Sequence, residues 1–520
     1  MKHSSPKFQL FLFTAALFCF VGLSAQKPVV KIKNGLISGY KSGDIAVFKG
    51  IPFAEPPAGN LRWKAPQPKS DWNGTLDCIS FSASPVQNKP VPFMMWTEEF
   101  ITPPEKLSED CLYLNVWTPS KSSGDKLPVF VWIYGGGFSS GSAACAIYDG
   151  EEMAKKGIIF VSINYRVGVL GFLAHPELSK ESTSGTSGNY GLLDQVEALK
   201  WVRDNISSFG GDPGKVTIAG QSAGSMSVWA MIVSPLTKGL FRAAIPQSGG
   251  ITTNLLGKSY EAAEARGAEF MKNAKAADIS ELRKVPAEEL FKISSGNGAG
   301  GGLSFAPVFD GYVLPKDVLQ AFKDGAFNNV SVLAGWVTGD GNMSFGQKQV
   351  PEKYRQDAIE KYGDNAEKFL KLFPGSTAEE VSSSSSRLTL LNFAAMADYT
   401  WAGSTKSPLY VYEFSHVPVD KPGFPNYGAF HTSEVPFALN NLHTWNRPWR
   451  DTDLAVEKTM NAYWVNFVKT GNPNGAGLPE WRTYVRSSGD IMEIGDQSKM
   501  IPGLYKNEFE LLEKVNSVKK

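Results

Sequence analysis

Short apolar runs alternate with polar and glycine-rich stretches along the first half of the chain. The runs at 113–117, 129–134 and 158–164 are rich in Val, Ile, Trp and Tyr, the residues that favour buried strands. The stretch 194–205 that follows has the composition and spacing of a helix. This alternation of strands and helices predicts a mainly parallel sheet with helices packed on it.

The hydrophobic pattern is different in the sequence before and after this region. Residues 28–60 alternate polar and apolar positions with glycine turns, which predicts small antiparallel hairpins. Residues 259–292 have a helical pattern, and 330–335 and 409–414 are further strand-like runs. The fold class predicted from these patterns is α/β.

The N-terminus has the features of an export signal. A basic start with Lys2 and Lys7 precedes an apolar run from Phe8 to Leu23, and small residues follow up to Ala25. This order predicts a signal peptide over residues 1–25, and an uncleaved anchor is the alternative. We therefore expect a periplasmic or secreted protein with no membrane span in the mature chain.

Charge and cysteine spacing exclude several classes of partner. The chain has 52 Lys and Arg against 51 Asp and Glu, a net charge of +1, so nothing points to nucleic acid or an acidic partner. No two of its four cysteines have the spacing of zinc ligands, so we expect no metal and no cofactor.

One motif carries candidate chemistry. Residues 216–224 read VTIAGQSAG, in which a β-branched strand leads into Gly-x-Ser-x-Gly and a helix-permissive stretch follows. This is the setting of a nucleophile elbow, which places Ser222 on a sharp turn at the carboxyl edge of a sheet. The backbone amide of Ala223 would then point at the reacting carbonyl group.

A second motif agrees with the first. The apolar run 127–134 ends in Gly135-Gly136-Gly137, which leaves backbone N–H groups free to face an anion. Such a loop upstream of the serine predicts an oxyanion hole built from the amides of Gly136, Gly137 and Ala223.

At this point the chain resembles a known family, the type-B carboxylesterases of the α/β-hydrolase superfamily, which include cholinesterases and bile-salt lipases. The likeness extends from about residue 28 to about residue 505 and is carried by motifs in the family's order. They are GIPFAEPP (50–57), SEDCLYLNV (108–116), NYRVG (164–168), GLLDQ (191–195), FGGDP (209–213), YWVNF (463–467) and GNPN (471–474).

The resemblance implies one α/β-hydrolase domain over residues 26–520 that hydrolyses small-molecule carboxylic esters. Two residues depart from the family pattern. Tyr134 stands where a histidine usually opens the oxyanion loop, and Gln221 precedes the serine where Glu is usual. A neutral Gln221 weakens the case for a cationic substrate such as a choline ester.

The resemblance also suggests the rest of a catalytic triad, in the order serine, acid, histidine. His431 lies in a stretch that matches the family's catalytic histidine, while we expect His416 to be structural and His443 to lie at the surface. Asp340 follows a predicted strand at the family's spacing for the acid. Asp310 is the alternative acid, although the tripeptide Phe-Asp-Gly that contains it is more typical of a turn, in which the carboxylate would have a structural role.

Further roles are implied by the same resemblance. Gln221 and Ser248 would support the triad from behind, and Arg62–Glu109 and Arg166–Asp194 would form structural ion pairs. Cys78 and Cys111 occupy the places of the family's first disulfide. Cys145 would then be a buried free thiol.

Some questions stay open at this level. An acyltransferase would use the same acyl-enzyme with an alcohol in place of water, and a non-catalytic binding relative would have lost part of the triad. Trp96 and the segments 91–104 and 394–407 are candidates to line the substrate site. The sequence leaves open the acyl and alcohol specificity and the oligomeric state.

Overall fold

The computed structural model describes residue 1 and residues 27–104, 106–251, 259–296, 304–343 and 350–518. Except for Met1, the predicted signal peptide (1–25) lies outside the described residues. Every helix within the described ranges is too short or too polar to cross a bilayer.

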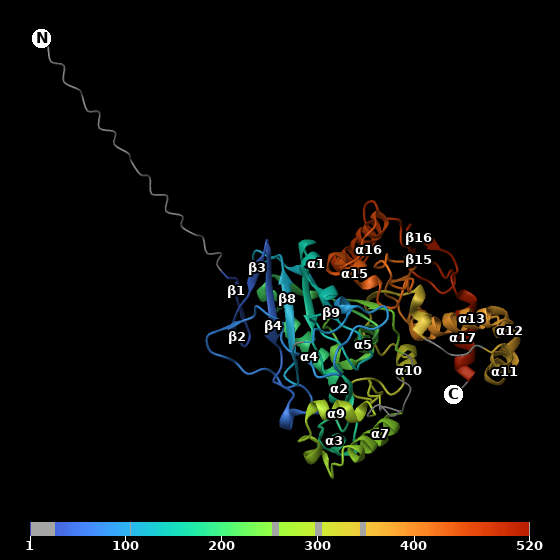
Figure 1. The fold of residues 1–520 in the computed structure, drawn as a ribbon, viewed down its shortest axis with the longest axis horizontal. Helices are drawn as coiled ribbons and strands as arrows, with labels where there is room; N and C mark the ends of the chain where they lie inside the picture. The colour runs from blue at the N-terminus through green and yellow to red at the C-terminus, as the bar shows by residue number, and fades with distance from the viewer. Residues whose placement is uncertain (2–26, 105, 252–258, 297–303, 344–349, 519–520) are drawn as a thin grey trace.

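An 11-stranded sheet runs through the centre of the molecule (Figure 1). Seven neighbouring strands, β10, β9, β11, β12, β13, β14 and β15, are parallel, and β8, β4, β3 and β16 add antiparallel edges. The sheet strands in spatial order are β16 (Lys499–Ile501), β15 (Ile491–Ile494), β14 (Leu409–Phe414), β13 (Ser331–Val337), β12 (Ala243–Gln247), β11 (Gly211–Gln221), β9 (Leu127–Ile133), β10 (Ile159–Ile163), β8 (Tyr113–Thr118), β4 (Ile45–Pro52) and β3 (Tyr40–Ser42). The mainly parallel sheet expected from the sequence is therefore present.

Smaller strands lie outside this sheet. Three form a separate sheet near the N-terminal side, β1 (Val29–Ile32), β2 (Gly35–Ser38) and β5 (Thr75–Asp77). Two short strands, β6 (Ser84–Pro85) and β7 (Leu107–Ser108), pair with each other. Residues of the long loop between these two strands line one side of a cavity at the carboxyl ends of β9 and β11.

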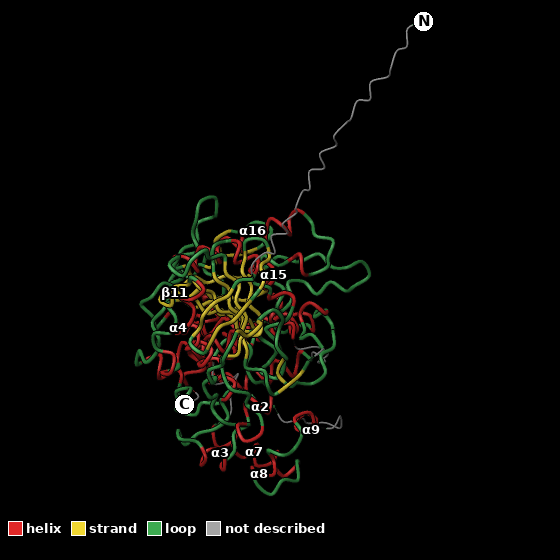
Figure 2. The backbone as a smooth tube through the Cα atoms, turned by 90° about the vertical axis from the view of Figure 1, so that its left-hand side faces the viewer, coloured by secondary structure: helices red, strands yellow, loops and turns green. Residues whose placement is uncertain are grey.

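Helices lie on both sides of the strands (Figure 2). Helix α5 (Ala223–Val233) packs against β11 and β12 and contacts α4 (Tyr190–Asn205), while α16 (Asp451–Thr470) packs against β9 and α15 (Glu434–Leu439). The remaining α-helices are α1 (Glu151–Lys155), α2 (Gly168–Phe172), α3 (Pro176–Glu181), α7 (Tyr260–Asn273), α8 (Ile279–Leu282), α9 (Ala287–Ser294), α10 (Val318–Lys323), α11 (Pro351–Tyr362), α12 (Ala366–Leu372), α13 (Ala378–Leu390), α14 (Met396–Ala402) and α17 (Lys506–Val518).

Two groups of these helices stand away from the sheet. Figure 1 shows α3, α7 and α9 together at its lower edge and α11, α12, α13 and α17 together at the right. Between α13 and α14 the chain makes a π-helical turn, Leu391–Ala395. Such turns are rare and often occur at functional sites.

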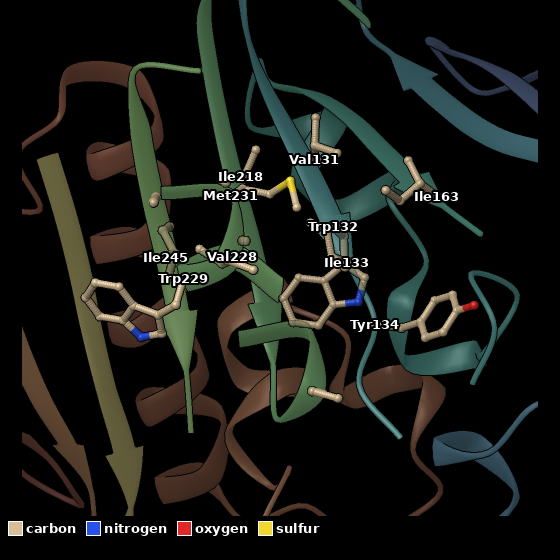
Figure 3. Close-up of a cluster of buried hydrophobic side chains, with 14 of the residues drawn as sticks. Val131, Trp132, Ile133, Tyr134, Ile163, Ile218, Val228, Trp229, Met231 and Ile245 are labelled. Atoms are coloured by element: carbon tan, nitrogen blue, oxygen red, sulfur yellow. The ribbon is translucent and has the colours of Figure 1, made fainter. Parts of the chain in front are cut away.

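The core that holds the central strands is mainly apolar. Side chains of β9, β10, β11, β12 and α5 meet there without solvent exposure (Figure 3). They include Val131, Trp132, Ile133, Ile163, Ile218, Val228, Trp229, Met231 and Ile245. Because parallel strands are covered on both faces, their sequences read as continuous apolar runs. This packing fixes the carboxyl ends of β9 and β11, where the two sequence motifs lie.

One of the two expectations about the cysteines is met, because Cys145 is a buried free thiol. Cys78, Cys111 and Cys145 are buried free thiols, so the disulfide expected between Cys78 and Cys111 is not formed in the structure. The two thiols face different surroundings. Cys78 Sγ lies 3.9 Å from the carbonyl oxygen of Gly50, whereas Cys111 is enclosed near the charges of Arg166 and Asp194.

Candidate active site

Ser222 lies in the sharp turn between β11 and α5, where a nucleophile elbow was expected. Its backbone has φ 60° and ψ −123°, a conformation that costs a non-glycine residue free energy and is common at functional sites. The amide N–H of Ser222 donates to the carbonyl of Gln247 over 2.9 Å, and its own carbonyl accepts from Met226. The turn is therefore held from both sides.

The glycines of the motif are required by the approach of β9. A Cβ atom at Gly224 would lie 2.1 Å from the carbonyl oxygen of Ile133, and one at Gly220 would lie 2.5 Å from the same atom. Real Cβ atoms do not approach backbone oxygen so closely, so only glycine permits the elbow to sit beside this strand.

The predicted oxyanion loop lies directly after β9. Gly136 and Gly137 have φ of 106° and 61°, and both line the same cavity as Ser222 and Ala223. The carbonyl of Gly136 accepts hydrogen bonds from the amides of Ser139 and Ser140. The loop is thus folded back on itself, and the structure brings the three expected oxyanion residues to one cavity.

Tyr134 has a structural role in supporting this loop. Its hydroxyl donates to the carbonyl of Tyr165 over 2.9 Å, and the Tyr165 hydroxyl donates to the carbonyl of Tyr134 over 2.8 Å. The two buried rings are stacked with centroids 4.4 Å apart. This reciprocal pair anchors the end of β9 without a charged or titrating histidine.

His431 and Asp340 are brought together although 91 residues separate them. Nδ1 of His431 lies 2.5 Å from Oδ1 of Asp340, and both side chains are buried. The other carboxylate oxygen of Asp340 accepts from the amide of Val337 at the end of β13. Because Nδ1–H donates to Asp340, the lone pair of Nε2 remains for a proton from a hydroxyl group.

The alternative residues have other partners. Asp310 accepts three backbone N–H groups, from Tyr312, Val313 and Leu314, which makes it a turn carboxylate. His416 is bound between Asp453 and Asp496, and His443 is exposed.

A buried carboxyl group behind the triad was not singled out from the sequence. Oε1 of Glu434 accepts from the Ser248 hydroxyl over 3.2 Å, and Ser248 is itself tied by its amide to the carbonyl of Gly335 in β13. Burial, together with the negative charge of Asp340, raises the pKa of Glu434 to about 8. The Glu434 carboxyl group is therefore mainly neutral at and below neutral pH.

Gln221 touches His431 from another side. Its Nε2 lies 3.4 Å from Nδ1 and 3.3 Å from Nε2 of the imidazole ring. Its Oε1 accepts from the Thr432 hydroxyl, which in turn accepts from the indole N–H of Trp96 over 3.2 Å. Thr432 has φ 89°, which is strained for a β-branched residue. Gln221, Thr432 and Trp96 thus connect the ring to the loop 86–106.

The edges of two aromatic rings also flank the imidazole. The Phe393 ring, in the π-helical turn, has its centroid 5.5 Å from that of His431, and the Trp96 ring is 6.5 Å away. Sequence reasoning named the neighbouring segment 394–407 but missed Phe393. A π turn leaves no simple periodicity by which this residue could have been found.

These groups border one mainly apolar cavity of about 540 Å³. Ser222, His431 and the oxyanion glycines line it, as do Val91, Phe93, Trp96, Phe100, Met226, Tyr148, Cys145 and Phe393. Burial raises the pKa of Cys145 to about 12, so this thiol is a poor nucleophile beside the serine. Among the described residues no three His, Cys, Asp or Glu side chains gather as metal ligands would.

The predicted ion pairs are formed elsewhere. Arg62 binds both oxygens of Glu109 and the carbonyls of Arg283 and Val285. Arg166 and Asp194 form a pair that is almost wholly buried. Both pairs brace the chain and lie outside the lining of the cavity.

Comparisons with known proteins agree with this geometry. The model of the carboxylesterase family matches residues 26–512. The chain is 36% identical to fumonisin B1 esterase of Sphingopyxis macrogoltabida, covering 91% of this chain and 87% of that protein. It is 34% identical to para-nitrobenzyl esterase of Bacillus subtilis, covering 88% and 92% respectively.

Solved structures give the same result. A PNB esterase superposes with a TM-score of 0.80 at 31% identity, covering 92% of this chain and 99% of the other. A carboxylesterase of Geobacillus stearothermophilus also gives 0.80 at 31% identity, covering 93% and 99%. These likenesses establish the α/β-hydrolase fold. The names of these relatives are those of esterases, which does not favour the acyltransferase alternative.

Proposed function

As a member of the carboxylesterase family the chain is a serine-type carboxylic ester hydrolase, and we propose that Ser222, His431 and Asp340 perform the reaction. The observation that carries this assignment is the short contact between Asp340 and His431, which lines the same cavity as the strained Ser222.

The first half of the reaction forms an acyl-enzyme. A free serine hydroxyl is a weak nucleophile, and His431 Nε2 takes its proton as Ser222 Oγ attacks the ester carbonyl. Asp340 holds the ring in the required tautomer and stabilises the imidazolium ion. The amides of Gly136, Gly137 and Ala223 bind the oxyanion, and each such donor typically contributes about 3 kcal/mol to lowering the barrier.

The second half repeats the sequence with water. The first half ends when His431 gives its proton to the leaving alcohol. His431 then deprotonates a water molecule that attacks the acyl carbonyl, and it returns this proton to Ser222 Oγ as the bond between the serine and the acyl group breaks and the carboxylic acid leaves. The strained turn at Ser222 and the folded oxyanion loop serve both halves of the reaction, so they need little rearrangement between acylation and deacylation. The apolar lining favours esters with an apolar acyl or alcohol part.

Kinetics of variants test this assignment. With para-nitrophenyl butyrate, Ser222→Ala and His431→Ala should each lower kcat by about 10⁵-fold or more, because the triad acts as a unit. Circular dichroism should confirm that the variants are folded. Substantial turnover by folded Ser222→Ala protein would contradict the assignment.

We also propose that the protein is exported to the periplasm or secreted. The support is the basic, apolar and small-residue order of residues 1–25, which is typical of a cleaved signal. The mass of protein recovered outside the cytoplasm tests this proposal. It should match a chain that begins near Gln26, and an intact N-terminus would contradict cleavage.

A further inference from the structure

The described residues that line the cavity beside Ser222 carry few charged side chains. Among the described residues that line it, no Asp or Glu is present, and Lys89 is the one Lys or Arg. Gln221, next to the serine, adds a neutral amide at a position that could hold a carboxylate. The acids that follow on the same loop, Glu98 and Glu99, do not line the cavity, and Glu99 accepts from Thr97 and Asn446.

The chain leading to Lys89 is held in place. The Gln87 side chain is buried and bonds Gly141 twice, accepting from its amide and donating to its carbonyl, each over 3.0 Å. Thr102 donates to the same Gln87 oxygen, and Asn88 donates to Ser295 at the end of α9. These bonds hold the backbone that leads to Lys89 beside the segment that follows the oxyanion loop.

No acid among the described residues forms an ion pair with the Lys89 ammonium group. The side chain is exposed and has no ion-pair or hydrogen-bond partner among the described residues. A single uncompensated charge at the mouth of an apolar cavity attracts ligands of opposite sign, because low-dielectric walls focus its field. The apolar residues Val91 and Phe93 stand beside it on the same loop, and both are more than half exposed.

We propose that the enzyme prefers esters that carry a free carboxylate together with an apolar part, and that Lys89 is the residue that selects them. This inference rests on the proposed function and names the substrate class of the same site. The apolar part would lie against Phe93 and Trp96, with the carboxylate at the Lys89 ammonium. A cationic ester of the same shape would be disfavoured.

Matched substrates test the preference on both sides of the ester. On the acyl side, mono-para-nitrophenyl suberate is compared with para-nitrophenyl octanoate and its omega-trimethylammonio analogue. On the alcohol side, para-carboxyphenyl butyrate is compared with para-carbamoylphenyl butyrate. The measured quantity is the ratio of kcat/KM for the charged and neutral members, after subtraction of spontaneous hydrolysis.

We expect the anionic-to-neutral ratio in at least one pair to fall about threefold in Lys89→Ala and about tenfold in Lys89→Glu. The cationic ester should gain relative to the neutral one in Lys89→Glu. The preference of the wild type should also shrink as salt is raised. Lys238→Glu, an exposed lysine outside the cavity lining, makes the same change in net charge and should leave the ratios near those of the wild type.

Two results would overturn the inference. In the first, the neutral esters are hydrolysed, but in both pairs the anionic-to-neutral ratio of kcat/KM for Lys89→Glu stays within twofold of the wild-type ratio. The other is an equal fall in Lys238→Glu, which would assign the effect to net charge. Failure of the wild type to hydrolyse even the neutral esters would instead contradict the proposed function on which the inference depends.

Discussion

At the scale of single residues, Asp340 and Asp310 present the sharpest contrast. Both are buried acids that precede a glycine. Asp340 contacts the imidazole, whereas the partners of Asp310 within the described parts of the chain are backbone amides and the Thr186 hydroxyl. A carboxamide can still accept from backbone amides, but it cannot stabilise an imidazolium ion.

We therefore expect Asp340→Asn to lower kcat by about 10⁴-fold and Asp310→Asn by less than about tenfold. Steady-state hydrolysis of a para-nitrophenyl ester measures both. The assignment of the acid fails if Asp310→Asn proves the more damaging of the two.

Glu434 gives a prediction about stability and pH. Its pKa is about 8 in the fold against an ordinary 4.5, so the folded state binds a proton that the unfolded state releases between these values. The free energy of unfolding should therefore fall as pH rises from about 4.5 to about 8. Below pH about 4.5 the stabilisation that depends on protonated Glu434 is fully retained.

Glu434→Gln cannot ionise and should escape this loss. Between pH 5 and pH 9 the wild type should lose on the order of 1–4 kcal/mol of unfolding free energy relative to the variant. Urea unfolding at both pH values measures it. Glu480→Gln, at an exposed position, is the control and should track the wild type; parallel behaviour of all three proteins would refute the argument.

Some features of the candidate site could be predicted from local sequence and others could not. The elbow and the oxyanion glycines lie within short motifs, so their positions could be predicted. Contacts of Gln221 with His431 and of Trp96 with Thr432 join residues 210 and 336 positions apart. Such distant contacts are set by the packing of the whole sheet, and no local pattern encodes them. Glu434 was missed as a partner of Ser248 for the same reason.

At the scale of elements, the nucleophile turn depends on the contact between α5 and β9. Gly224 is the second residue of α5. A side chain there would meet the carbonyl oxygens of Ile133 and Tyr134 at 2.1 and 2.9 Å. Neither atom can move without displacing the strand that leads to the oxyanion loop.

Gly224→Ala should therefore lose several kcal/mol of stability and nearly all activity. Gly124→Ala is the matched control, because its added Cβ would meet only the Ser122 hydroxyl at 3.6 Å, and it should change stability by less than about 0.5 kcal/mol. Thermal unfolding and ester hydrolysis measure both. A stable, active Gly224→Ala enzyme would show that the elbow tolerates a side chain.

Strand positions were predictable because buried parallel strands are uniformly apolar. The run predicted at 129–134 is observed as β9, which begins two residues earlier and ends one residue earlier. The run predicted at 409–414 coincides with β14. Their order in space was not predictable in this way. Strand β11 lies between β9 and β12, an arrangement decided by crossover connections rather than by any strand's own sequence.

At the scale of the whole molecule, the number of free thiols depends on whether the signal is removed and whether a disulfide forms. The full chain has four cysteines, of which Cys19 lies in the predicted signal, and the other three are free in the structure. We expect the denatured, unreduced protein recovered outside the cytoplasm to react with three equivalents of a thiol reagent. One equivalent would instead indicate a disulfide, and four would indicate that the signal is retained with all thiols free.

The central claim is that ester hydrolysis proceeds through an acyl-enzyme on Ser222. Its most direct test is to inactivate the enzyme with a para-nitrophenyl dialkyl phosphate and to map the adduct by peptide mass spectrometry. The account predicts one adduct per chain, on Ser222, that rises in step with the loss of activity, and no adduct in Ser222→Ala. Inactivation with the phosphoryl group on another residue, or with Ser222 unmodified, would contradict it.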